Sequence, residues 1–153
     1  MKSYITLLIF LCMGIIGFAQ DVKIPQKVDD LAVRYAEATA FFEIVAEALA
    51  KSGRENSKAE AMRDDAMLYS LLLANEGRSR EFAVKVTHAR IEFSKKEMLK
   101  EMDYRNENIA IITNKYEESS LDLIKNPTKE VSDLLAKTAR DEKNASHGDS
   151  IKK

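Results

Sequence analysis

Cysteine is almost absent from this chain of 153 residues, since Cys12 is the only one. Cys12 lies within an apolar N-terminal run, which we expect to be removed as a signal peptide. The remaining chain would then contain no thiol. This excludes disulfides, cysteine nucleophiles and thiolate metal sites from the mature protein, whatever the redox state of its compartment.

Net charge is also nearly absent, because 24 Lys and Arg residues are balanced by 25 Asp and Glu residues. Without an excess of positive charge, the protein has no overall field that would attract nucleic acid or an anionic membrane. We therefore expect no nucleic-acid partner. A hydrophobic content of 45% alongside 32% charged residues is typical of a globular domain and not of a disordered chain.

The first 19 residues have the features of a cleaved signal peptide. Lys2 supplies positive charge, residues 5–18 are almost wholly apolar, and Gly17 and Ala19 are the small residues that signal peptidase requires. The apolar run is shorter than the ~20 residues needed to span a bilayer, so we expect cleavage after Ala19 and not a membrane anchor. The mature protein would be exported, to the periplasm or the extracellular space, with no integral membrane segment.

The segment over residues 27–51 has the most regular pattern in the chain. Its apolar residues recur three or four positions apart, which places them on one face of a helix that must pack against other helices. Gly53, just beyond this segment, is suited to end the helix. The residues of the predicted buried face are Val28, Leu31, Tyr35, Ala38, Phe42, Val45 and Leu49.

A second helix is predicted from Ser57 to about Glu76, with Gly77 ending it. Residues 78–126 contain no glycine or proline, so they form one long helix or two. A single helix would reach roughly 70 Å at 1.5 Å per residue, too long for its neighbours to cover, and we predict a turn within residues 103–108. The core positions predicted before this turn are Phe82, Val86, Ala89 and Phe93, followed after a slip in phase by Met98 and Met102.

A short last helix is predicted to begin at Pro127, and its apolar pattern fades by Arg140. Residues 141–153 are predicted to be a disordered tail. The expected fold class is therefore all-α. We predict that residues 20–140 form an up-and-down antiparallel bundle of four main helices with a short C-terminal helix.

Candidate catalytic or metal-binding residues are few. His88 is the only histidine in a predicted helix, and Glu92 lies one turn later on the same face, but metal sites in proteins need more ligands than this pair. We therefore expect no enzyme activity, no cofactor and no bound metal. The alternative is a haem or metal carrier that uses His88 and one of the methionines, which are soft ligands: Met62, Met67, Met98 or Met102.

One feature of residues 27–51 goes beyond a single packed face. Phe41, Ile44 and Ala48 form a second stripe beside the first. The stripe is core if this helix lies centrally among its neighbours, which we favour, or it is an exposed surface for a partner protein, a peptide or a second copy. The function predicted from the sequence is that of an exported, non-enzymatic helical bundle acting through protein or ligand binding.

Overall fold

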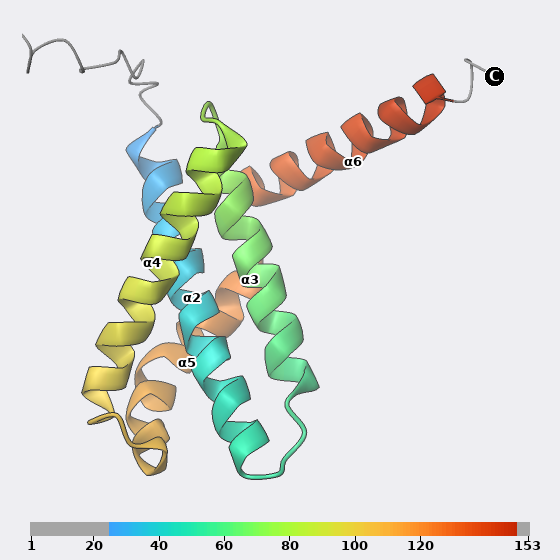
Figure 1. Ribbon diagram of the computed structural model, residues 1–153. Coiled ribbons are helices and arrows are strands. Elements are labelled where there is room, and N and C mark those ends of the chain that lie inside the picture. The colour runs from blue at the N-terminus through green and yellow to red at the C-terminus, as the bar shows by residue number, and fades with distance from the viewer. Residues whose placement is uncertain (1–24, 150–153) are drawn as a thin grey trace, which may run out of the picture.

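The computed structural model describes the backbone of residues 25–149 and the side chains as far as Arg140, and the elements in this range are all helical (Figure 1). The predicted all-α, antiparallel bundle is confirmed, with α2 to α5 as its four main helices. The elements are α2 (Gln26–Lys51), α3 (Ser57–Asn75), α4 (Arg80–Glu101), the 3-10 turn η2 (Asn106–Asn108), α5 (Ile109–Lys125) and α6 (Lys129–Asp149).

Helix α2 is the centre of the bundle and packs against α3, α4 and α5 (Figure 1). Its buried residues lie around most of its circumference, because three helices cover it from different sides. Where α3 crosses it, Ser70 Oγ donates a hydrogen bond to the carbonyl oxygen of Ala32 over 2.9 Å. The buried side chains of α2 are Leu31, Ala32, Tyr35, Ala36, Ala38, Thr39, Ala40, Phe41, Phe42, Ile44 and Ala46.

The connections follow the predicted helix ends. Gly53 and Gly77 both have a φ of +68°, in the left-handed region that closes helices α2 and α3. Ser79 begins α4, since its side chain accepts a hydrogen bond from the backbone N–H of Phe82 over 3.2 Å. Helix α4 ends at Glu101, and helical structure resumes with η2 and α5, so the predicted turn within residues 103–108 is confirmed.

The predicted core positions in α4 are wrong at Phe82, Ala89 and Phe93. Phe82 is 49% exposed and Phe93 is 66% exposed, and Ala89 is exposed as well. The helical spacing of the buried Met98 and Met102 continues toward the start of α4 with no change of phase. The buried face of α4 is therefore a different one from the predicted face through Phe82 and Phe93. The residues on this buried face are Ala83, Thr87, Ile91, Met98 and Met102.

Helix α6 docks through its first turns, with Val131 buried and Leu134 and Leu135 packed against the core. Its backbone continues as helix through residues 141–149, where we predicted the beginning of a disordered tail, and Figure 1 shows it pointing away from the bundle. Glu142, Lys143 and Ala145 are the strong helix formers in this stretch. The rest of the predicted tail and the predicted signal peptide, residues 1–19, lie outside the described residues.

No helix between residues 25 and 149 has the length and hydrophobicity needed to span a membrane.

Candidate functional site

The largest exposed hydrophobic residues of the described chain concentrate on α4 and the turn that follows it. Phe82, Val84 and Phe93 lie on α4, and Tyr104 lies in the turn; their exposed fractions range from 37% to 66%. Single exposed apolar residues are ordinary, but several on one helix mark a surface that binds something. This surface is therefore the first candidate for a functional site.

Two of these residues, Phe82 and Phe93, lie in line with the half-buried Val86 and the exposed Ala89. We call this seam the outer α4 stripe: Phe82, Val86, Ala89 and Phe93. Their spacing of four, three and four residues places them along one line of the helix, opposite the buried Thr87 and Ile91. The same spacing forms the contact seam between two helices in a coiled coil. The outer α4 stripe therefore has the pattern of a helix-packing surface, although no helix of the described bundle covers Phe82 or Phe93.

Phe93 also borders a hollow of about 410 Å³ next to the end of α4. Leu99 and Tyr104 line it with Phe93, and its rim carries Lys95 and Lys96. Tyr104 has a φ of +57° and follows Asp103 at +53°, so two consecutive non-glycine residues adopt the left-handed conformation. Such a conformation is costly for a tyrosine, and residues of this kind cluster at functional surfaces.

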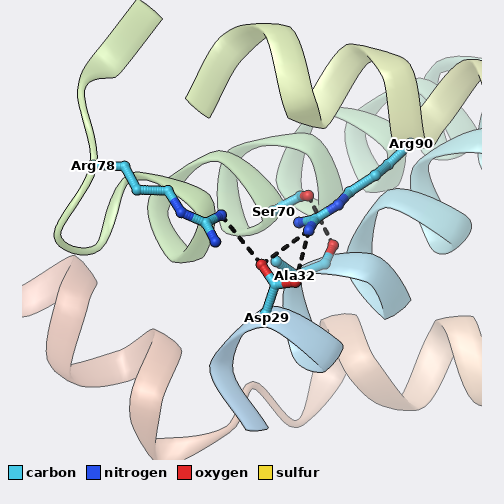
Figure 2. A network of polar contacts seen from close by, with 5 residues as sticks. All are labelled: Asp29, Ala32, Ser70, Arg78 and Arg90. Atoms are coloured by element: carbon cyan, nitrogen blue, oxygen red, sulfur yellow. Dashed lines mark hydrogen bonds and ion pairs between the residues drawn. The ribbon is translucent and has the colours of Figure 1, made fainter. Parts of the chain in front are cut away.

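Polar contacts of Arg90, midway along α4, and of Arg78, just before the helix, fix the rotation of α4 (Figure 2). Arg90 Nη2 lies 2.9 Å from both carboxylate oxygens of Asp29 on α2, and Arg78 Nη1 lies 3.2 Å from Asp29 Oδ1. Figure 2 shows the two arginines approaching this carboxylate from opposite sides. Burial raises the pKa of Asp29, but the hydrogen bonds and charges of the arginines outweigh it and hold the pKa below its ordinary value.

A second set of contacts holds the other half of α4. Lys95 Nζ lies 2.7 Å from Glu43 Oε1 and 2.8 Å from Glu47 Oε1, both on α2. Burial lowers the pKa of Lys95, but hydrogen bonds to the two carboxylates outweigh it and raise the pKa. Helix α4 is thus tied to α2 at two levels, which holds the outer α4 stripe toward solvent.

The charged residues beside the outer α4 stripe, unlike Arg90 and Lys95, make no ion pair with α2. Within the described part of the chain, Lys85 pairs with Glu81 alone, at 2.7 Å, and both side chains are more than 70% exposed. Among residues 25–140, Glu92 and Lys96 have no ion-pair partner. A partner that covers the stripe could therefore pair with these charges without breaking a buried contact.

The stripe proposed from the sequence as a possible interaction surface lies elsewhere. Phe41 and Ile44 are 2% and 3% exposed, and Ala48 is half-buried. The Phe41 ring centre lies 6.5 Å from that of Tyr116, so α5 contributes to its cover. The structure places Phe41 and Ile44 of this stripe in the core, in keeping with the central position of α2.

The residues of the haem or metal alternative are not brought together. His88 and Glu92 are exposed on α4, whereas Met98 and Met102 are fully buried in the core. Met62 and Met67 are half-buried on α3. Within the part of the chain that the structure describes, no three side chains of His, Cys, Asp or Glu are grouped as metal ligands would be.

A larger hollow of about 630 Å³ lies between the start of α2 and the start of α6. Six of its seven lining residues are charged or polar, and Leu31 is the only large aliphatic residue among them. Lys27 Nζ and Glu130 Oε1 lie 2.6 Å apart across it, and the Lys27 ammonium lowers the pKa of Glu130 to about 2. Because these charges satisfy each other, this hollow is a weaker candidate than α4.

The sequence pattern assigns the four residues of the outer α4 stripe to the core, because they are apolar and recur at helical spacing. Extending the phase of Met98 and Met102 backwards would have identified the true buried face. Comparison of the chain with protein-family models, with curated proteins and with solved structures found no match.

Proposed function

We propose that this protein is an exported, non-enzymatic helical bundle that binds another protein through the outer α4 stripe. The observation that carries the proposal is the exposure of Phe93, at 66%, in line with Phe82 on a helix whose rotation is fixed. Aromatic residues are enriched in the centres of protein interfaces, and covering them with a partner removes a large apolar area from water. Export is supported by the sequence of residues 1–19.

A protein partner suits this site better than a small ligand. Small-molecule sites are concave and enclose most of the ligand, whereas the outer α4 stripe runs along the outward face of a helix, with a hollow only beside Phe93. An outward seam with coiled-coil spacing is complementary to a groove or to another helix. The haem or metal carrier predicted as an alternative has no comparable observation in its favour.

Site-specific photo-crosslinking in the native compartment tests this function. A photoreactive amino acid replaces Phe93 in one variant and Glu118, an exposed residue of α5, in the control. We expect a discrete protein adduct from position 93 and none from position 118, because only the former contacts the partner. The absence of an adduct at position 93, or the same adducts at both positions, would contradict the proposal.

A further inference from the structure

We infer that the protein bound by the outer α4 stripe is a second copy of this chain, whose own α4 packs antiparallel to the first about a two-fold axis. This inference rests on the proposed function, because it names the partner of the same surface. It follows from two properties of the stripe. When a second copy of α4 lies antiparallel to the first, the apolar residues of the two copies match, and the charges beside the stripe meet charges of opposite sign.

The apolar residues match when the stripe is paired with a reversed copy. Phe82 then faces Phe93 of the second copy, and Val86 faces Ala89 of the second copy. The smaller pair lies at the two-fold axis, where the helices come closest, and the two aromatic pairs lie on either side. Aromatic pairs of this kind stabilise an interface beyond their buried area, and each helix carries both partners.

The charges distinguish antiparallel from parallel packing. Lys85 and Glu92 both border the stripe on the same side, seven residues apart. In an antiparallel pair Lys85 of each copy faces Glu92 of the other, which gives two symmetric ion pairs. In a parallel pair Lys85 would face Arg90, which is already paired with Asp29, and Glu92 would face Glu97, so no new pair of opposite charges would form.

The helix presents these residues without rearrangement. The ties from Arg90 to Asp29 and from Lys95 to Glu43 already hold α4 in position, so little ordering is needed on association. The stripe from Phe82 to Phe93 is only about 17 Å long at 1.5 Å per residue. Such a small interface predicts a reversible dimer with a dissociation constant on the order of micromolar or weaker.

Sedimentation equilibrium of the exported protein, over roughly 1 µM to 1 mM, measures this association. We expect a reversible monomer–dimer equilibrium in the wild type. Phe93→Ser should raise the dissociation constant by at least about tenfold, because it removes an aromatic residue from the interface. The control Ile111→Ser changes an apolar residue of α5 that is 48% exposed and lies off the stripe, so the dissociation constant should stay unchanged.

Charge exchange tests the antiparallel arrangement itself. Lys85→Glu and Glu92→Lys should each weaken the dimer by about three- to tenfold, since symmetry places each change in two ion pairs. The double variant restores opposite charges and should return to within about twofold of the wild type. An equimolar mixture of the two single variants should form a heterodimer more tightly than either variant forms its own dimer.

A wild type that stays monomeric throughout this range would overturn the inference, as would a dimer insensitive to Phe93→Ser. A double variant or mixture that fails to recover would overturn it too. These failures are separable from failure of the proposed function. A monomer that still gives a photo-crosslink from position 93 to a different protein would keep the binding function and eliminate only the second copy as partner.

Discussion

The Nη2 atom of Arg90 on α4 lies 2.9 Å from each carboxylate oxygen of Asp29, in the first turn of α2 (Figure 2). Arg90 is only 18% exposed, so its charge is held largely away from water and depends on this carboxylate. Helix α4 cannot rotate without breaking the pair. The contact therefore separates the two faces of α4, the buried one with Ile91 and the outward one with Phe93.

The first prediction concerns Asp29. Replacement by Asn keeps the shape but removes the charge that compensates Arg90, and should lower the free energy of unfolding at pH 7 by about 1–2 kcal/mol. Urea unfolding measures this change. The control is Asp133→Asn on α6, an exposed aspartate with no ion pair among the described residues, which should have little effect.

The pair of Asp29 and Arg90 also predicts that the stability of the fold depends on pH in the acid range. The pKa of Asp29 in the folded protein lies below the ordinary value of 3.8, so the unfolded state binds its proton first as the pH falls. The stabilisation from Asp29 is complete above pH 3.8 and is lost as the pH falls from there through the folded pKa. Urea midpoints of wild type and Asp29→Asn should converge in that window, and a constant difference down to pH 2 would contradict the assignment.

The second prediction compares two phenylalanines. Phe42 is 4% exposed in the core, and Phe42→Ala should lower the free energy of unfolding by about 3–5 kcal/mol through lost burial and a cavity. Phe93→Ala should cost less than about 1 kcal/mol in dilute solution, because Phe93 is 66% exposed. If Phe93→Ala lowered the free energy of unfolding as much as Phe42→Ala does, Phe93 would be buried and the faces of α4 would be assigned incorrectly.

The third prediction compares two isoleucines. Ile44 is 3% exposed and Ile111 is 48% exposed, so a carboxylate is buried without a partner at position 44 but reaches water at position 111. Ile44→Glu should destabilise the fold by several kcal/mol, whereas Ile111→Glu should change it by less than about 1 kcal/mol. Thermal unfolding by circular dichroism measures both. A fully stable Ile44→Glu protein would return Phe41, Ile44 and Ala48 to the candidate surfaces.

The sequence predicts the helices and their ends well because both follow from local properties. Gly53 and Gly77 take the left-handed conformation that their positions after apolar patterns indicate. Of the seven residues predicted for the core face of α2, four are buried and Val28, Val45 and Leu49 are half-buried. The sequence of α4 contains two apolar patterns, one through Phe82 and Phe93 and one that continues from Met98 and Met102, and contacts with neighbouring helices determine which of them is buried. The contacts of Arg90 with Asp29, and of Lys95 with Glu43, join residues more than 50 positions apart and decide which face points inward.

The fourth prediction is the N-terminus of the exported protein. Gly17 and Ala19 are suited to signal peptidase, so the mature chain should begin at Gln20. Intact-mass measurement of protein from the exported fraction determines this directly. Membrane-embedded protein that retains residues 1–19 would contradict it.

The most direct test of the account is a fluorescence measurement on Phe93→Trp, because the sequence contains no other tryptophan. Acrylamide quenching reports how freely solvent reaches the new indole at position 93. In dilute solution quenching should approach that of free tryptophan, and it should fall as the protein concentration rises and a second copy covers the outer α4 stripe. An indole shielded even at the lowest concentration would show that this face of α4 is buried in the bundle and would contradict the account.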